Sequence, residues 1–304
     1  MRASFALCEP APGHHPMTCY DAVVIGAGPA GLTAATYLGR FRRSVLVLDG
    51  GPSRASWIPE THNTPGFSRG ISGPDLLGLL RDQAGQYGAE IRASRVHEIE
   101  KTEIGFRLVL DDGAVDARFV LLSTGVVDLK PTLPGIDDAI RSSLVRICPI
   151  CDAYEAIDKR IAILGDSDLG AREALFLRHY SKDVTLLHTG AEALTDVKAL
   201  KASGVRVIQS RSDAIILGQK EVAVERDVFD HLYLALGCHV QSDLVRALAA
   251  AHDSDGNLVV DAHQQTSVDG LYAAGDVVRG LNQIAIAAAE AALAATAIHN
   301  RLRV

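Results

Sequence analysis

Two cysteines, Cys148 and Cys151, stand three positions apart, and an aspartate, Asp152, follows them directly. Two thiols with this spacing can close a small ring and cycle between dithiol and disulfide. An adjacent carboxylate can donate or accept the proton that such exchange requires. The same spacing could form half of a zinc site, but zinc needs four ligands, commonly supplied by two such pairs. The three other cysteines of the sequence form no second pair. The pattern therefore favours redox chemistry over a metal site or inert thiols.

A glycine-rich turn follows the first predicted strand of the chain. The apolar run 22–25 is typical of a buried parallel strand, and it continues into residues 26–31, which read GAGPAG. In such a turn Gly26 permits the tight bend, and Gly28 lets a pyrophosphate approach the backbone. Gly31 lets the following helix pack closely against the strand.

The segments after this turn complete the pattern of a nucleotide-binding unit. We expect a helix over 32–41 and a second buried strand over 44–48 that ends in Asp49. The N-terminus of the helix would supply N–H groups and a positive dipole to the phosphates, and Asp49 is placed to accept hydrogen bonds from a ribose. Because strand, glycines, helix, strand and acid occur in this order, the sequence predicts dinucleotide binding.

A second unit repeats this architecture with different chemistry. A predicted strand over 160–164 runs into residues 165–170, which read GDSDLG, and then into a predicted helix. Ser167 stands where a second glycine would let a pyrophosphate come close. Asp166 and Asp168 add negative charge beside the expected phosphate position.

The strand that closes this second unit is followed by residues 188–190, which read HTG. They offer neither an acid for a ribose 2′-hydroxyl nor arginines for a 2′-phosphate. Charge-assisted hydrogen bonds contribute roughly 1.5–3 kcal/mol each, so two missing arginines predict NADPH binding that is weaker by roughly 10²- to 10⁴-fold. The open alternative is a drifted but working site that uses Lys198 or Lys201 for the phosphate.

Composition limits the classes of protein to which the chain can belong. Its 304 residues suffice for about two domains, and 48% apolar with 22% charged residues is typical of a soluble globular protein. A net charge of −7 and a pI near 5.9 argue against a nucleic-acid partner. The longest apolar stretch, 284–298, contains Glu290 and is too short to span a membrane. We expect a cytoplasmic protein with an unstructured tail or a misassigned start at residues 1–16, which make no convincing signal peptide.

Three further motifs occur along the chain in a distinctive order. They are an Asn-x-Pro-Gly-Phe loop at 63–67, Ser-Thr-Gly at 123–125 and Ala-Gly-Asp at 274–276. Together with the glycine turn and the cysteine pair, they resemble the low-molecular-weight thioredoxin reductase family of flavoproteins over nearly the whole chain, 20–302.

This resemblance implies a fold and a domain organisation. The fold is α/β, with two Rossmann-like, three-layer nucleotide-binding domains, the FAD domain being discontinuous and the second domain inserted in it. The FAD domain would comprise residues 1–130 and 255–304. The inserted domain would comprise residues 131–254 and carry the redox cysteines. The resemblance also implies a homodimer.

Most FAD contacts are assigned by the resemblance. It implies that Asp49 holds the adenosine ribose, Val96 touches the adenine and Asn63 lies near the flavin ring. It also implies that Asp276 bonds the ribitol and that Gln283 lies beside the isoalloxazine. The implied FAD-binding positions are Gly26, Gly28, Pro29, Ala30, Gly31, Asp49, Asn63, Val96, Thr124, Gly125, Gly275, Asp276, Gln283 and Ile284.

By the same resemblance, Cys151 faces the flavin, Cys148 attacks an external disulfide and Asp152 manages the proton. The partner would be a thioredoxin-like protein, or a small disulfide or dithiol.

The sequence departs from the family pattern mainly where NADPH would bind. The family's His-Arg-Arg falls at 188–190, its later arginine at Leu194, its Gly-x-Gly at 165–167 and its Arg-Gln at 282–283. These changes keep the flavin and the thiols but undercut NADPH or NADH as electron donor, which favours ferredoxin or another carrier. Three alternatives stay open: an ordinary NADPH-dependent thioredoxin reductase, a dithiol oxidase that uses oxygen, and a non-catalytic flavin-binding redox sensor.

Overall fold

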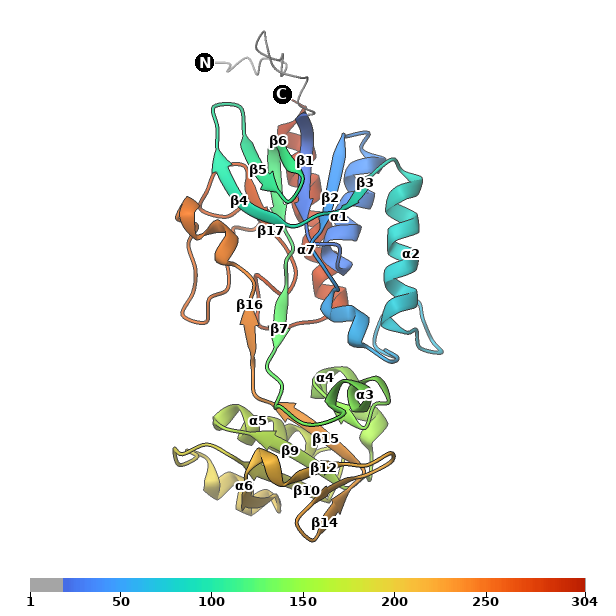
Figure 1. Ribbon diagram of the computed structural model, residues 1–304, viewed down its shortest axis with the longest axis vertical. Coiled ribbons are helices and arrows are strands. Elements are labelled where there is room, and N and C mark those ends of the chain that lie inside the picture. The colour runs from blue at the N-terminus through green and yellow to red at the C-terminus, as the bar shows by residue number, and fades with distance from the viewer. Residues whose placement is uncertain (1–18, 304) are drawn as a thin grey trace. The chain divides into compact units, whose positions relative to one another are not determined.

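The computed structural model describes residues 19–303, and these residues divide into two compact units (Figure 1). The first unit contains the described residues up to Ser56, the segment Pro74–Val126 and the residues from Val240 onward. The second unit contains Trp57–Gly73 and Val127–His239. The tail expected at residues 1–16 lies outside the described residues.

The first unit is built on a seven-stranded sheet with the order β3-β2-β1-β6-β5-β4, in which β17 also pairs with β6. Strands β3, β2, β1, β6 and β17 pair in parallel, whereas β4, β5 and β6 form an antiparallel meander. The strands are β1 (Cys19–Ile25), β2 (Val45–Asp49), β3 (Glu90–Ala93), β4 (Val96–Lys101), β5 (Phe106–Leu110), β6 (Gly113–Leu122) and β17 (Leu271–Ala273). The helices are α1 (Pro29–Arg40), α2 (Gly73–Gln86) and α7 (Ile284–Arg301), with short 3₁₀ turns η1 (Arg54–Trp57) and η4 (Asp243–Leu248).

Small side chains let α1 and α7 approach each other closely on this sheet. The buried alanines of α7, among them Ala291 and Ala294, share one core cluster with Ala34 and Leu38 of α1 and with Val24 of β1. Burial of this apolar surface is the main force that stabilises the layer. The close packing fixes the segment that precedes α7 beside the start of α1.

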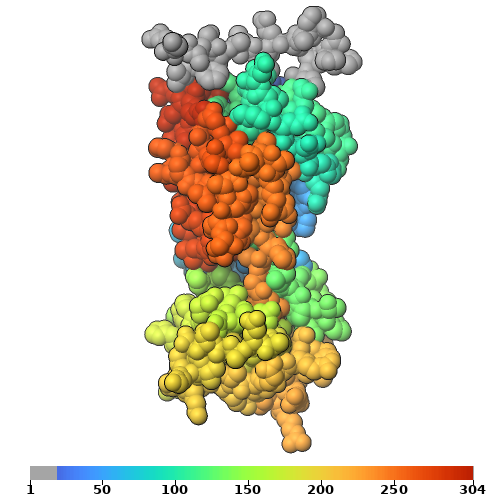
Figure 2. All heavy atoms as spheres, turned by 90° about the vertical axis from the view of Figure 1, so that its left-hand side faces the viewer, coloured from blue at the N-terminus to red at the C-terminus, as the bar shows by residue number. Residues whose placement is uncertain are grey.

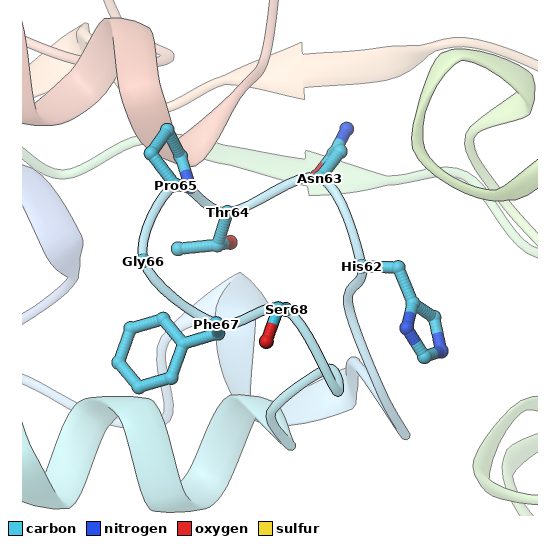
Figure 3. Close-up of a pocket in the computed structure, with 7 residues that line it drawn as sticks. All are labelled: His62, Asn63, Thr64, Pro65, Gly66, Phe67 and Ser68. Atoms are coloured by element: carbon cyan, nitrogen blue, oxygen red, sulfur yellow. The ribbon is translucent and has the colours of Figure 1, made fainter.

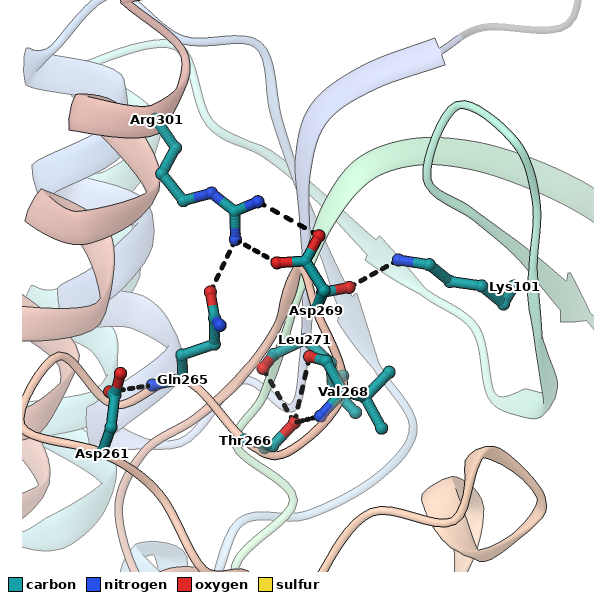
Figure 4. Close-up of polar contacts among 8 residues, drawn as sticks. All are labelled: Lys101, Asp261, Gln265, Thr266, Val268, Asp269, Leu271 and Arg301. Atoms are coloured by element: carbon teal, nitrogen blue, oxygen red, sulfur yellow. Dashed lines mark hydrogen bonds and ion pairs between the residues drawn. The ribbon is translucent and has the colours of Figure 1, made fainter. Parts of the chain in front are cut away.

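The end of α7 is tied to the turn before β17 by a group of polar contacts (Figure 4). Arg301 contacts the Asp269 carboxylate at 2.8 Å and donates to the Gln265 side chain at 2.6 Å. Lys101 donates to the Asp269 carbonyl at 2.5 Å. These contacts anchor the C-terminal helix to strand β17 and to the β4–β5 hairpin.

The second unit is built on a five-stranded parallel sheet with the order β11-β10-β9-β15-β8, and it also has a three-stranded antiparallel sheet, β12-β13-β14. Its strands are β8 (Val145–Arg146), β9 (Ile161–Gly165), β10 (Val184–His188), β11 (Arg206–Gln209), β12 (Ile215–Leu217), β13 (Val222–Val224), β14 (Asp227–Phe229) and β15 (His231–Ala235). Its helices are α3 (Ile136–Arg141), α4 (Pro149–Asp152), α5 (Asp168–Leu177) and α6 (Val197–Ser203), with 3₁₀ turns η2 (Tyr154–Ala156) and η3 (Ser212–Ala214).

Two short strands, β7 (Val126–Asp128) and β16 (Cys238–Val240), carry the chain into and out of the second unit and pair with each other. Gln241 donates its N–H to the Gly125 carbonyl at 2.9 Å, and Leu129 donates to the Gly237 carbonyl at 3.0 Å. The two connections therefore form one hydrogen-bonded ribbon.

The α/β fold with two Rossmann-like units is confirmed, but the boundaries differ from the expected ones. The return to the first unit comes at Val240 rather than at residue 255, because Val245 of η4 lies in the core of that unit. The orange segment containing η4 lies against the teal segment containing β4 (Figure 2). The segment Trp57–Gly73 groups with the second unit, where Trp57 packs against the core beside β8.

Candidate active site

The glycine turn of the first unit leaves no room for larger residues at two positions. The turn starts with the Gly26 N–H bonded to the Leu48 carbonyl at 2.9 Å, and Gly26 has a φ of 108° that side chains rarely adopt. A Cβ at Gly31 would lie 1.9 Å from the Gly26 carbonyl oxygen. The backbone of the helix therefore packs directly against the backbone of the turn. Ser123 adds hydrogen bonds from its hydroxyl to the Ile25 and Gly26 carbonyls.

Helix α1 begins with surroundings suited to an anion. Its N-cap is Gly28 and its first residue is Pro29, and its first turn holds no acidic residue. Within residues 19–303, no side chain caps this end. The N-terminal N–H groups and the helix dipole therefore point at a position that no carboxylate or hydroxyl of α1 occupies.

The polar groups expected to hold a dinucleotide follow the carboxyl ends of neighbouring parallel strands. Ile25 of β1 is level with Leu48 of β2 and Leu122 of β6, and Ala273 of β17 is level with Leu122. Asp49, the glycine turn, Thr124, Gly125 and Gly275 therefore share one edge of the sheet. This edge is where open α/β sheets bind their ligands.

Asp49 and Thr124, two of the expected FAD ligands, have partners within this unit. The Asp49 carboxylate accepts the Gly51 N–H at 3.3 Å and an Arg81 guanidinium N–H at 2.6 Å. Thr124 donates its hydroxyl to the Gln241 carbonyl at 2.5 Å. Val96 is the first residue of β4.

The loop after β17 is held by a buried acid that the sequence did not single out. The side chain of Glu290, in α7, accepts the Gly275 N–H at 2.9 Å and is paired with Arg279. A Cβ at Gly275 would lie 3.0 Å from the Ala30 Cβ, so this loop touches α1 directly. The next residue, Asp276, lies 3.4 Å from Arg54, while Gln283 and Ile284 form the N-cap and first residue of α7. The chain thus brings Ala30, Gly275 and the start of α7 together.

These residues fit an FAD. A flavin dinucleotide requires an open helix N-terminus, a glycine turn too tight for side chains and carboxylates at the carboxyl ends of parallel strands, and this unit has all three. Asn63 alone among the expected FAD-binding positions lies in the segment that groups with the second unit.

The loop around Asn63 lines a shallow, open pocket of about 340 Å³, formed by residues 62–68 (Figure 3). His62 and Asn63 point outward from the loop, whereas Thr64 points into its bend and is buried. The Thr61 hydroxyl donates to the Asn63 side-chain oxygen at 3.0 Å, which orients the Asn63 amide.

Cys148 and Cys151 form a disulfide in the second unit. Cys148 is the N-cap of α4 and Cys151 lies within it, with a Cα–Cα distance of 5.3 Å. Both residues are half-buried. The structure therefore brings the two expected redox thiols together in their oxidised form, and Asp152 ends the same helix.

Both carboxylate oxygens of Asp152 have donors from neighbouring strands. Arg146 of β8 lies 2.8 Å from Oδ2, and the Tyr233 hydroxyl of β15 donates to Oδ1 at 2.9 Å. Burial raises the pKa of Asp152, while Arg146 and Tyr233 act to lower it. Sequence reasoning missed these two partners, because only the pairing of β8 with β15 brings them together.

The loop after β10 lies against the end of β9 and the turn that leads into α5, through backbone contacts. Thr189 donates its N–H to the Gly165 carbonyl at 2.9 Å. A Cβ at Gly190 would lie 1.9 Å from the Asp166 carbonyl oxygen. No residue larger than glycine fits at position 190 without moving the loop.

Two side chains fasten the same loop further along. Leu194 is buried in the core cluster that contains Ala171 of α5. Thr195 donates its N–H and its hydroxyl to the Asp168 carboxylate at 2.9 and 2.7 Å, and these bonds lower the pKa of Asp168. The helix N-terminus that would receive phosphates thus carries a carboxylate and contacts its own loop.

The structure also bears on metal binding and membrane insertion. Within residues 19–303, no three His, Cys, Asp or Glu side chains come together in a way that could hold a metal ion. None of the helices in this range combines the length and the apolar character that crossing a membrane requires.

Comparisons with known proteins agree with this geometry. The family described as pyridine nucleotide-disulphide oxidoreductase matches residues 20–291. The chain is 30% identical to a thioredoxin reductase of Mycolicibacterium smegmatis, over 92% of this chain and 95% of that protein. It is also 30% identical to a bifunctional thioredoxin reductase/thioredoxin of Mycobacterium leprae, over 91% of this chain and 64% of that protein. A thioredoxin reductase structure from Streptococcus pyogenes superposes with a TM-score of 0.85 at 26% identity, over 94% of this chain and 98% of that one.

Proposed function

This chain belongs to the pyridine nucleotide-disulphide oxidoreductase family, as a thioredoxin reductase-like, FAD-dependent disulfide oxidoreductase, and we propose that its electrons come from a carrier other than NADPH. FAD, when bound, supplies a two-electron redox partner for the cysteine pair. In this proposal Cys148 exchanges with the external disulfide, Cys151 closes the internal disulfide and Asp152 handles the proton. Reduced ferredoxin is the donor class we favour.

The observation that carries this proposal is the contact between the loop after β10 and the turn that joins β9 to α5. The 2′-phosphate of NADPH needs cationic side chains after β10, and this chain has Thr189 and Gly190 there. The 1.9 Å distance from a Cβ at Gly190 to the Asp166 carbonyl excludes an arginine at position 190 in this loop conformation. Asp168 adds negative charge where a pyrophosphate would lie, and like charges weaken binding.

The external substrate in this proposal is the disulfide of a thioredoxin-like protein, or a small disulfide or dithiol. The M. leprae relative fuses a thioredoxin reductase to a thioredoxin, which supports a protein disulfide as partner. Homodimer formation and a cytoplasmic location, both expected from the sequence, stay predictions.

Anaerobic stopped-flow mixing tests the electron donor. We expect NADPH and NADH at millimolar concentration to bleach the flavin slowly, and reduced ferredoxin to bleach it fast. Bleaching within milliseconds at micromolar NADPH would contradict the proposal. It would favour an ordinary NADPH-linked enzyme in which the exposed Lys198 or Lys201 of α6 contacts the phosphate. Fast reoxidation by air during turnover with a dithiol would instead indicate a dithiol oxidase.

The Cys148→Ser variant tests the site itself. We expect turnover with a protein disulfide to disappear and a long-wavelength charge-transfer band from the Cys151 thiolate to appear. The Cys238→Ser variant is the matched control, because it removes a thiol outside the pair, and it should keep full activity. Full turnover by Cys148→Ser would exclude the cysteine pair as the active site. A flavin without any exchange activity in the native protein would favour the redox-sensor alternative.

A further inference from the structure

The Asp152 carboxylate, next to the cysteine pair in the chain, is bound by the side chains of Arg146 and Tyr233. Val145 and Arg146 of β8 pair in parallel with Leu232 and Tyr233 of β15, so Arg146 and Tyr233 are direct neighbours across the two strands. Arg146 reaches Asp152 Oδ2 at 2.8 Å, and the Tyr233 hydroxyl reaches Oδ1 at 2.9 Å. The same hydroxyl lies 3.3 Å from the Asp152 backbone carbonyl. The carboxylate therefore has one defined orientation.

Burial makes these contacts strong and specific. Tyr233 is fully buried, and only 9% of the Arg146 side chain is exposed, whereas 25% of the Asp152 side chain is exposed. Asp152 is thus exposed enough to exchange protons with its surroundings, while burial holds Arg146 and Tyr233 in place against it. The Arg146 Nε is buried and has no hydrogen-bond partner within residues 19–303. A buried guanidinium with an unpaired donor costs stability, and the ion pair with Asp152 offsets part of that cost.

We propose that Arg146 and Tyr233 are positioning residues that hold Asp152 beside the cysteine pair as an oriented, ionised carboxylate. The inference rests on the proposed function, in which Cys148 and Cys151 form the working disulfide. Asp152 then serves as the proton acceptor of the exchange, and the positive charge of Arg146 offsets part of the effect of burial, which still leaves the pKa of that carboxylate above its ordinary value.

The exchange step balances with Asp152 as a carrier of protons. The Cys148 thiol gives its proton to Asp152, and its thiolate attacks an external disulfide, which releases one external thiolate. That thiolate takes the proton back from Asp152. The Cys151 thiol loses its proton in the same way, and its sulfur then attacks Cys148, which releases the second external thiolate. Two electrons pass from the pair to the external disulfide, and the two protons of the pair end on the two external thiols.

The other charged groups near Asp152 have separable effects. Glu155 of η2 raises the pKa of Asp152 further, in the same direction as burial. Burial and the charge of Arg146 lower the pKa of His231, in β15, to about 4, and its Nδ1 donates to the Ser143 carbonyl at 3.1 Å. Burial raises the pKa of Tyr233 well above its ordinary value, so its hydroxyl stays protonated throughout the working range. His231 is thus neutral above about pH 5, so its charge does not change over most of the working range.

A single-turnover measurement tests the proposal without any electron donor. The cysteine pair is reduced with dithiothreitol, the excess reagent is removed, and the rate of reaction with 5,5′-dithiobis(2-nitrobenzoate) is followed from pH 4.5 to 9. Arg146→Met should move the acid limb of the rate profile upward by about 1 pH unit or more, since loss of an adjacent opposite charge has this effect. Tyr233→Phe should move it by about 0.5–1 unit, the equivalent of one hydrogen bond. Arg146→Lys should restore most of the native profile.

The Asp152→Asn background separates positioning from a purely structural role. In that background, Arg146→Met and Tyr233→Phe should cause no further shift, because the group on which they act is gone. Native profiles in both single variants would overturn the proposal. An undiminished shift in the Asp152→Asn background would also overturn it, because it would assign the limb to a group other than Asp152. If Arg146→Met fails to fold, the test uses the two milder variants, Tyr233→Phe and Arg146→Lys. Tyr233→Phe removes only a hydroxyl and should still shift the acid limb. Native-rate exchange by Cys148→Ser would contradict the proposed function itself, a result distinct from these.

Discussion

The N-termini of α1 and α5 follow the same strand–turn–helix order, yet their surroundings are opposite. Helix α1 starts after Gly28 with no acidic residue in its first turn, and it faces the carboxyl ends of β1 and β2. Helix α5 starts after Ser167 with Asp168 in its first turn, and Thr195 of the following loop is bonded to that acid. The comparison teaches that a Rossmann-like unit can keep its architecture after the features that bind a nucleotide have changed.

The largest expected effect is on the α1 side. Gly31→Ala would place a Cβ 1.9 Å from the Gly26 carbonyl oxygen, a backbone contact that no rotamer can relieve. We expect insoluble or colourless protein, because overpacking of this kind costs more than the usual ~1–3 kcal/mol and also displaces the phosphate-binding turn. Soluble expression and the flavin absorbance per protein measure the effect.

Gly170→Ala is the matched control in α5. Its Cβ would lie 3.0 Å from the Gly165 Cα and from the Leu186 side chain, a milder crowding. This variant should lose roughly 1–3 kcal/mol of stability and keep its flavin. Equal flavin content in Gly31→Ala and Gly170→Ala would break the comparison between the two units.

The next effect concerns the contact at α5. Asp168→Asn combined with Thr195→Val removes the negative charge and both side-chain hydrogen bonds that fasten the loop. NADPH affinity, measured by flavin bleaching, should rise by about 10- to 100-fold, the equivalent of one or two charge-assisted contacts. Thr189→Arg alone should give less.

Gly190→Arg should not restore NADPH binding and should lower the melting temperature. The reason is the 1.9 Å contact of its Cβ with the Asp166 carbonyl. A gain in NADPH affinity from Gly190→Arg without loss of stability would show that the loop opens freely in solution.

Helices α5 and α1 also differ in that α5 contains a buried acid, Glu173. Burial raises the pKa of Glu173 to about 7 from 4.5, and its Oε2 has no hydrogen-bond partner within residues 19–303, whereas α1 contains no acid at all. Because the folded state holds this proton more tightly, stability should fall as the pH rises from about 4.5 to about 7 and then level off. Glu173→Gln should remove this fall and stabilise the protein at pH 8 by at most about 3 kcal/mol. Urea unfolding of the native protein and of Glu173→Gln at pH 5 and pH 8 measures these stabilities. A Glu173→Gln variant that is less stable than the native protein at pH 8 would contradict the prediction.

The smallest effect is expected at Glu290, which supports the first unit. Glu290→Gln keeps an acceptor for the Gly275 N–H but removes the charge that pairs with the exposed Arg279. We expect a loss of about 1 kcal/mol in stability and a modest rise in flavin dissociation. Thermal melts with and without added FAD separate the two effects. A loss of stability and flavin as large as that of Gly31→Ala would show that the Glu290–Arg279 pair, rather than the glycine turn, organises the expected FAD site.

Much of the fold could be predicted from local sequence patterns. The apolar runs at 22–25 and 160–164 fall within or overlap β1 and β9. The residues Asp111-Asp112-Gly113, a composition typical of a hairpin turn, join β5 to β6, where Leu110 pairs with Gly113. Helix α1 starts at Pro29 rather than at residue 32, because proline suits the first helical position after a glycine turn. Local periodicity and turn chemistry were sufficient for these features.

Other features depend on contacts between distant segments and carry no local signal. Arg146 and Tyr233 are 87 positions apart, and only the pairing of β8 with β15 brings them to Asp152. In the sequence Thr195 is an ordinary loop residue, and only the structure shows that its hydroxyl donates a hydrogen bond to the Asp168 carboxylate. The sequence showed which cationic residues are missing from the second unit, but it could not show that the loop itself contacts the helix. Packing, not residue type, decided these cases.

The paired strands β7 and β16 have a consequence for how such a chain is assembled. Because β7 and β16 are hydrogen-bonded to each other, the two ends of the segment 127–239 lie side by side. A gene segment with ends at this ribbon can be exchanged for another without a change in the strand order of the flavin-binding sheet, as for other domain insertions whose ends lie close together. A change of electron donor in evolution can therefore be confined largely to residues 127–239, as long as the contact of Trp57 with the core beside β8 is kept, while the flavin-binding residues of the first unit stay as they are.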